Sequence, residues 1–179
     1  MTRARSTDGA EGPAPSALPL PEQITAARDA ALRLLSVRER SARELAARLR
    51  QKGFSHDAIE GALERLQEVE LQSDARFADR WASAAAGRGL AAPRIQGELR
   101  ARGVDPELAA QAATADPEAE RDRALAFART RAARMPGVER QVVARRIAGL
   151  LARRGYDADT CRAISDAVAG DGFLDPDSS

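Results

Sequence analysis

A short phrase that occurs three times constrains the fold of this chain more than any other feature of its sequence. It reads RQKGFSHD at residues 50–57, RARGVDPE at residues 100–107 and ARRGYDAD at residues 152–159. In each copy a basic stretch is followed by glycine, a hydrophobic residue and then serine or aspartate. Glycine readily ends a helix in the left-handed conformation, and serine or aspartate caps the start of the next one. The phrase therefore predicts, three times, that one helix ends and another begins.

The residues on either side of the phrase have the spacing of amphipathic helices. Before the first glycine, Leu45 and Leu49 are one helical turn apart, and after it Ile59, Leu63 and Leu66 recur at helical spacing. The glycines recur about every fifty residues, a period typical of helical repeat proteins. The hydrophobic residue after each glycine lies between two helices and is expected to be buried. These residues are Phe54, Val104 and Tyr156.

A further helical stretch precedes each helix pair. The three stretches are residues 26–37, 73–87 and 120–135. We therefore expect an all-α fold of about nine helices, in an elongated tandem array of three three-helix repeats whose neighbours share apolar surface. The expected repeats span residues 23–72, 73–117 and 118–170, with a disordered leader at residues 1–22 and an acidic flexible tail at residues 171–179.

Composition argues against several classes of function. The chain has one histidine, His56, and one cysteine, Cys161, so neither an internal disulfide nor a thiolate metal cage can form. It has no Gly-rich phosphate loop, and His56 lacks acidic partners at metal-ligand spacing. We interpret His56 as solvated, and Cys161, Phe77 and Trp81 as core residues. We expect no catalytic site, metal, cofactor or small-molecule substrate. Without a signal peptide or membrane-spanning stretch, we expect a cytoplasmic protein.

Several of these segments together resemble a known family. The order ALRLLSVRERSARELAARLRQKGF, DARFADRW, GRG and RIQGELRARGV, between residues 31 and 104, resembles the bacterial regulatory protein RecX family. The resemblance extends from about Ala26 to Val168, and the first two repeats carry most of it. The third repeat is looser, because RMPGVERQVV lengthens the link between its first two helices and Ala152 stands where Arg50 and Arg100 stand in the others.

The resemblance implies a non-catalytic regulator of the RecA recombinase, active in DNA repair, recombination and the SOS response. Proteins of this family bind the RecA nucleoprotein filament, lie along its groove and mainly inhibit its recombinase, ATPase and co-protease activities. We accordingly expect a monomer that binds RecA on DNA, with at most weak direct contact to the DNA. The alternatives are a helical DNA-binding protein that sets one helix of a three-helix unit in the major groove, and a scaffold that contacts neither.

Charge is distributed unevenly along the chain. The whole chain has 28 basic and 27 acidic residues, a net charge of +1, which argues against a dedicated nucleic-acid coat protein. Residues 120–154 contain ten arginines and three acidic residues, whereas residues 155–179 contain six aspartates and one arginine. The basic stretch suits an acidic partner surface or phosphates, and the acidic end suits competition for it. An equally weighted interpretation is that genome bias places arginine on solvated helix faces.

Helical geometry separates the basic residues of the second helix of each repeat into two groups. At about 100° per residue, four arginines point away from the apolar stripe and are our candidates for partner contact: Arg43, Arg50, Arg100 and Arg145. We add Arg94, Arg146 and Arg153, on the same helices, as further candidates. The other group falls near the stripe, so its stems should lie on the core and its charges at helix C-termini. This group is Lys52, Arg102 and Arg154.

Overall fold

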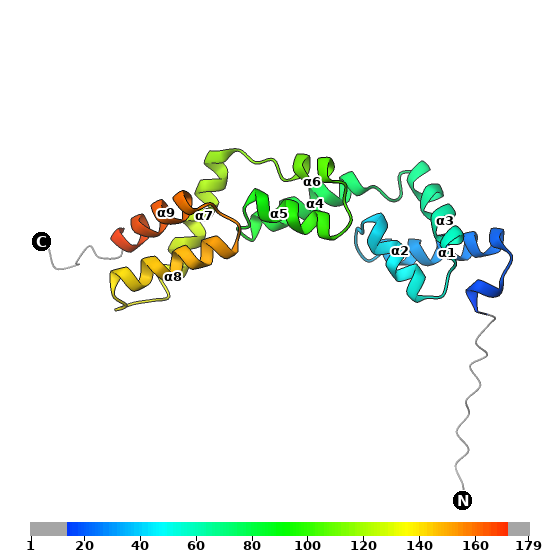
Figure 1. Ribbon diagram of the computed structural model, residues 1–179, viewed down its shortest axis with the longest axis horizontal. Coiled ribbons are helices and arrows are strands. Elements are labelled where there is room, and N and C mark those ends of the chain that lie inside the picture. Colours follow the sequence, from blue (N-terminus) through cyan, green and yellow to red (C-terminus); the bar gives the residue numbers. More distant parts are fainter. Residues whose placement is uncertain (1–13, 172–179) are drawn as a thin grey trace, which may run out of the picture. The chain divides into compact units, whose positions relative to one another are not determined.

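The computed structural model describes residues 14–171, and all regular structure in this part of the chain is helical (Figure 1). A short 3-10 helix, η1, spans Pro15–Ala17. The α-helices are α1 (Leu20–Leu35), α2 (Ala42–Gln51), α3 (His56–Glu68), α4 (Asp74–Gly87), α5 (Ala92–Ala101), α6 (Pro106–Ala112), α7 (Pro117–Ala132), α8 (Arg140–Arg153) and α9 (Ala158–Asp171). The all-α fold of nine helices that the sequence predicts is confirmed for the described residues.

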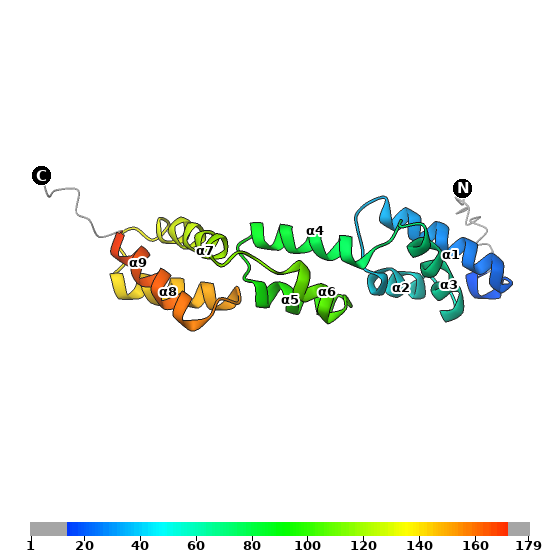
Figure 2. The same cartoon turned by 90° about the horizontal axis from the view of Figure 1, so that it is seen from above.

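The described chain forms two compact units, the first ending at Ser73 and the second beginning at Asp74. In the first unit, α1 packs against both α2 and α3. In the second unit, α4 packs on α5 and α6, and α7 packs on α8 and α9, which lie side by side (Figure 2). Each unit is therefore built from the three-helix groups that the recurring phrase predicts, one group in the first unit and two in the second.

The predicted helix stops at the three glycines are confirmed. Gly53, Gly103 and Gly155 have φ angles of 87°, 84° and 93°, directly after α2, α5 and α8. In each case the amide of the next residue donates to the carbonyl of a leucine five residues earlier, at 3.2 or 3.3 Å. This is the hydrogen bond of a Schellman motif, which satisfies a carbonyl left free at a helix end. The glycines are therefore structural.

The predicted helix starts are also confirmed. The Ser41 hydroxyl accepts from the amide of Glu44 at 3.1 Å, and the Ser55 hydroxyl accepts from the amide of Ala58 at 3.3 Å. The Asp157 carboxylate accepts from two amides at the start of α9, at 2.9 and 3.0 Å. Each cap satisfies backbone donors that have no partner within the helix.

Three clusters of buried side chains form the core of the described residues, one in each three-helix group. The residues after the glycines, Phe54, Val104 and Tyr156, are buried as predicted. Cys161 and Phe77 are also buried core residues, and Trp81 packs against the core while partly exposed. The two helix groups of the second unit were expected to share apolar surface. Among the described residues, one buried residue shows this sharing: Ala91, in the link between α4 and α5, packs in the core of α7–α9.

The first helix begins earlier than the sequence predicts. Residues 1–22 were expected to be disordered, but α1 starts at Leu20 and η1 precedes it; residues 1–13 lie outside the described part. Gln23 explains the difference, because its side chain is buried and donates to the carbonyl of Leu18 at 2.8 Å. Its carbonyl oxygen accepts from the Ser55 hydroxyl at 2.8 Å. Gln23 therefore ties the start of α1 to the cap of α3.

Candidate interaction surface

The second helix of each group carries exposed arginines outside its row of buried core residues. In α2 the buried residues are Leu45 and Leu49, in α5 they are Ile95 and Leu99, and in α8 they are Val143, Ile147 and Leu151. The seven predicted contact residues are all exposed: Arg43, Arg50, Arg94, Arg100, Arg145, Arg146 and Arg153. Their exposure follows from the helical period and makes them accessible to a partner.

The basic character of these helices differs. In α2, Glu44 pairs with Arg38, their charged atoms 2.9 Å apart, and in α5 the Arg94 guanidinium lies 3.3 Å from the Glu98 carboxylate. Helix α8 contains four arginines and no acidic residue. An uncompensated row of arginines produces the stronger positive potential. Among the three helices, α8 is therefore the best suited to an acidic partner.

The structure places Arg94 of α5 against the end of α8. Arg94 at the start of α5 packs against Gly155, and a Cβ atom placed on Gly155 would lie 2.6 Å from the Arg94 Cβ. Since Gly155 is two residues after Arg153, α5 and the end of α8 meet there. Arg100 lies at the other end of α5, and Arg43 and Arg50 belong to the first unit.

Arg154 ties α4 to α8 at this same junction. Its guanidinium Nη1 donates to the carbonyl of Arg88 at 2.6 Å, and its Cζ lies 3.8 Å from the centre of the Phe127 ring. Its own carbonyl accepts from the amide of Ala91 at 2.9 Å. Burial, with the nearby charge of Arg131, lowers the pKa of Arg154. The Arg154 guanidinium is stabilised both by the face of the Phe127 ring and by the carbonyl at the C-terminal end of α4.

The sequence predicts a structural role for the three basic residues near the apolar stripe, Lys52, Arg102 and Arg154. This prediction is confirmed for Arg102 and Arg154 and wrong for Lys52. Arg102 lies over Trp81, with its Cζ 3.6 Å from the ring centre, and it donates to the carbonyl of Glu98. Arg154 behaves likewise over Phe127. Lys52 is instead exposed, and unlike Arg102 and Arg154 it has no aromatic ring under its charge among the described residues.

A cluster of arginines that sequence analysis missed lines a cavity between α4 and α7. The cavity has a volume of about 330 Å³. Its charged residues are Arg88, Arg123, Arg131 and Arg134, and within residues 14–171 no carboxylate forms an ion pair with any of them. The signal in the sequence was the spacing of Arg123, Phe127 and Arg131, each one helical turn from the next. The cavity suits an anionic group.

His56 is exposed, and its Nε2 lies 3.9 Å from a carboxylate oxygen of Glu60. Between residues 14 and 171, no group of three or more His, Cys, Asp or Glu side chains could hold a metal ion. In that same stretch, the helices are too short or too polar to cross a bilayer. The exposed arginines of α2, α5 and α8 therefore remain the candidate contact residues.

Family models match the two N-terminal helix groups. Residues 27–66 match the first three-helix domain of RecX, and residues 73–112 match the second. The first range contains α2 and the glycine after it, Gly53, and the second contains α5 and Gly103.

Proteins named Regulatory protein RecX are similar over most of the chain. The protein of Amycolatopsis mediterranei is 40% identical over 144 residues, which cover 79% of this chain and 82% of the relative. That of Thermobifida fusca is 40% identical over 157 residues, covering 86% and 84%. That of Mycolicibacterium smegmatis is 42% identical over 139 residues, covering 73% of each.

Solved structures have the same fold. The crystal structure of RecX from Lactobacillus salivarius matches with a TM-score of 0.72 at 20% identity, covering 83% of this chain and 97% of that one. A second crystal structure, of regulatory protein RecX, matches with a TM-score of 0.73 at 19% identity, covering 82% and 74%. With two matching domains and relatives at about 40% identity, this chain belongs to the RecX family of regulatory proteins.

Proposed function

We propose that this protein is a non-catalytic regulator that binds the RecA nucleoprotein filament and mainly inhibits its ATPase, recombinase and co-protease activities. The observation that carries the proposal is membership of a family of regulatory proteins named RecX, established over most of the chain. In this proposal the protein acts as a monomer in the cytoplasm, where the filament forms.

The charge of α8 supports a partner with an acidic surface. Arg145, Arg146 and Arg153 are exposed on this helix, which has no acidic residue. The Arg146 guanidinium lies 4.0 Å from the Met135 sulfur, a weak contact that leaves its donors available. A guanidinium presents five donors in a fixed fork that matches carboxylates and phosphates. A filament of protein on DNA offers both groups.

The second candidate function is binding to DNA itself. The observation that favours it is the cavity lined by Arg88, Arg123, Arg131 and Arg134, which suits a backbone phosphate. Binding of this kind would depend on DNA and not on RecA. The two functions therefore differ in which component of the filament the protein recognises.

A pull-down with RecA tests the proposal. The tagged protein is incubated with RecA alone, with single-stranded DNA alone, and with both plus a nucleotide analogue that keeps the filament assembled. We expect retention to be strongest with the assembled filament. Equal retention on DNA alone would favour the DNA-binding function, and absence of RecA from every arm would contradict the proposal.

A pair of variants sharpens this experiment. Arg145→Ala with Arg146→Ala removes two charges from α8, and Arg33→Ala with Arg65→Ala removes two exposed charges from α1 and α3. We expect only the first pair to lose filament binding. Equal loss in both pairs would mean that net charge, and not the α8 surface, is recognised.

A further inference from the structure

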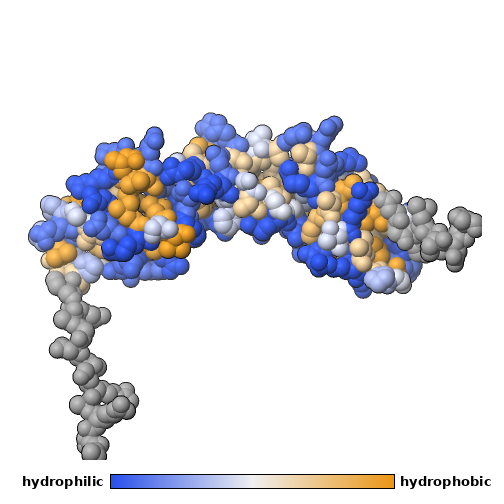
Figure 3. All heavy atoms as spheres, turned by 180° about the vertical axis from the view of Figure 1, so that it is seen from behind, coloured by the Kyte–Doolittle hydropathy of each residue, from blue (hydrophilic) through white to orange (hydrophobic). Residues whose placement is uncertain are grey.

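An apolar groove opens at the end of the third helix group. It lies among the C-terminal end of α7, the link to α8, the first turns of α8 and the last turn of α9, with a volume of about 660 Å³. Its apolar lining includes Met135, Pro136, Val138, Val143 and Val168. This group also exposes a hydrophobic patch to solvent, visible in Figure 3. Apolar side chains that filled this groove would remove its lining from water, which is energetically favourable.

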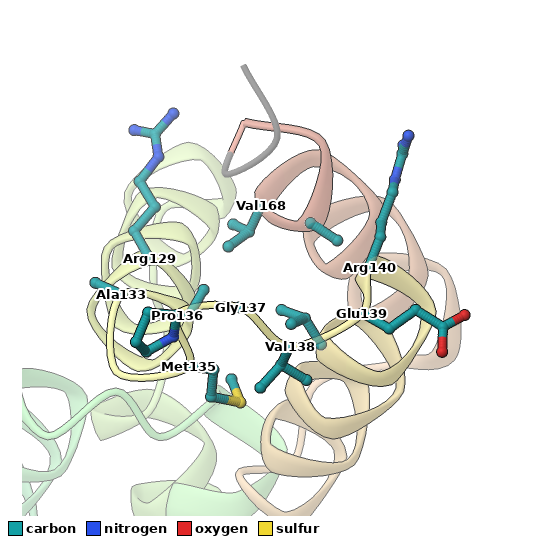
Figure 4. Close-up of a pocket in the computed structure, with 12 residues that line it drawn as sticks. Arg129, Ala133, Met135, Pro136, Gly137, Val138, Glu139, Arg140 and Val168 are labelled. Atoms are coloured by element: carbon teal, nitrogen blue, oxygen red, sulfur yellow. The ribbon is translucent and has the colours of Figure 1, made fainter. Parts of the chain in front are cut away.

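The rim of the groove carries two arginines, Arg129 and Arg140, and one exposed glutamate, Glu139, whose side chain points away from the opening (Figure 4), so the rim is basic on balance. Arg129 from α7 and Arg140 from α8 stand on opposite sides of its opening, with Val168 between them (Figure 4). The Arg140 guanidinium reaches the last turn of α9, where its Nη2 lies 3.5 Å from the position of a Cβ atom on Gly170. An acidic group that follows an apolar one into the groove would therefore meet positive charge.

The chain itself supplies a segment of this composition at this place. Helix α9 ends at Asp171, two residues after Ala169, which lines the groove. The next eight residues read GFLDPDSS. The pair Phe173 and Leu174 is apolar, and Asp175 and Asp177 follow it. A residue spans at most about 3.6 Å of extended chain, so Phe173 begins within reach of the groove.

We propose that residues 172–179 dock in this groove, with Phe173 and Leu174 on its apolar lining and Asp175 and Asp177 toward Arg129 and Arg140. The order of the segment, apolar first and acidic second, matches the order of lining and rim. A short tether gives the segment an effective concentration on the order of millimolar, so weak contacts are enough for docking. A separate peptide of the same sequence has no such advantage.

Docking would also change the surface that faces a partner. The aspartates would lower the positive potential around Arg129 and Arg140, near the basic helix α8. The segment would then compete with an acidic partner for this end of the protein. This consequence alone rests on the proposed function.

Nuclear Overhauser effects test the docking without any partner. The full chain is prepared with protonated Phe rings and Val methyl groups in a deuterated background, and Phe173→Leu assigns the ring of Phe173 among the four phenylalanines. We expect cross-peaks from this ring to the methyls of Val143 and Val168. Their absence would overturn the proposal. A mixture of chains labelled only in Phe and only in Val must lack them, because cross-peaks there would identify a second copy as the occupant.

Matched variants check the chemistry of the contact. Phe173→Ser with Leu174→Ser should shift the methyl signals of Val138, Val143 and Val168, whereas Ser178→Ala with Ser179→Ala should leave them unchanged. Arg140→Gln should weaken the cross-peaks, and so should added salt in the parent chain. Methyl signals that respond equally to both pairs would contradict a specific contact of the two apolar side chains.

The consequence for partner binding has its own measurement. If docking competes with the partner, the variant Phe173→Ser with Leu174→Ser should bind the RecA filament several-fold more tightly than the parent. Unchanged affinity, with cross-peaks present in the parent, would contradict the competition and leave the docking established. Absence of the cross-peaks in a chain that still binds the filament would overturn the docking alone, and presence of the cross-peaks in a chain that does not bind the filament would contradict the proposed function alone.

Discussion

At Gly155 an unusual backbone conformation and a close contact coincide. Its φ is 93°, and a Cβ atom there would lie 2.6 Å from the Cβ of Arg94 and 3.2 Å from its backbone nitrogen. Gly89 also has a positive φ, 79°, but a Cβ there would meet its nearest neighbour at an ordinary 3.7 Å. The two glycines therefore separate the cost of the conformation from the cost of the contact.

The first prediction compares two single variants, Gly89→Ala and Gly155→Ala. Gly89→Ala should lower the free energy of unfolding by roughly 1–2 kcal/mol, the cost of a left-handed conformation for a residue with a Cβ. Gly155→Ala should cost clearly more, because the backbone of Arg94 has to move. Denaturant unfolding of the two variants measures this difference. Equal losses would show that the α5–α8 contact is not tight.

Tyr156 gives the second prediction, on pH. Its hydroxyl is buried without a hydrogen-bond partner among the described residues, and burial, followed by the charge of Glu120, raises its pKa above the ordinary value of about 10. The folded protein thus holds this proton more tightly than the unfolded chain. The contribution of Tyr156 to stability is complete below pH of about 10 and is lost as pH rises through the raised pKa.

The chain has one tyrosine, so the ultraviolet absorbance of tyrosinate follows this group alone. We expect the midpoint in the folded protein to exceed that in denaturant. Tyr156→Phe should leave stability at neutral pH nearly unchanged, since it removes an unpartnered hydroxyl, and should reduce the fall in stability at high pH. Equal midpoints in the folded and unfolded states would contradict the assignment.

At the scale of helices, local signals in the sequence were sufficient for the ends of α2, α5 and α8. Each stop needs only a glycine and the carbonyls of the preceding turn, and each start needs only one serine or aspartate nearby. The start of α1 was missed because it depends on Gln23 and Ser55, which are 32 residues apart. The arginine cavity was missed because Arg88 and Arg123 come from different repeats, and helical period describes one helix at a time.

The cap of α5 shows a contact of this long-range kind and gives the third prediction. Its N-cap residue, Ala91, has no side chain that accepts a hydrogen bond, and the Glu120 carboxylate of α7 accepts from the amide of Ala92 at 2.8 Å. Glu120→Ala should cost about 1 kcal/mol, as loss of a cap does, and should speed hydrogen exchange of the Ala92 amide.

The matched control is Glu118→Ala, which removes an exposed carboxylate from the same turn of α7. We expect it to leave the exchange rate of the Ala92 amide unchanged. Glu120→Gln keeps an acceptor and should fall between the two alanine variants. Equal exchange in the Glu120 and Glu118 alanine variants would mean that α7 does not cap α5.

For the whole molecule, the outward and inward basic residues should have separable roles, which is the fourth prediction. Changing Arg50, Arg100 and Arg145 together to Ala should alter stability by no more than about 0.5 kcal/mol each, because they are exposed. The variant should bind the filament more weakly and with a smaller dependence on salt, since fewer charges are neutralised on association.

The contrasting variant changes Arg102 and Arg154 to Ala. Their guanidinium groups lie over Trp81 and Phe127, so we expect a lower melting temperature and unchanged affinity in the folded fraction. Melting temperature and filament affinity are measured for both variants at two salt concentrations. An outward variant that binds like the parent would exclude these three arginines from the contact surface.

The most direct test of regulation of RecA is a titration of the protein into RecA's DNA-dependent ATP hydrolysis, carried out at two DNA and two RecA concentrations. A regulator bound along the filament contacts several RecA subunits, so inhibition should be half complete at concentrations below that of RecA and should follow the RecA concentration. Inhibition that follows the DNA concentration, and requires enough protein to cover the DNA, would contradict the account.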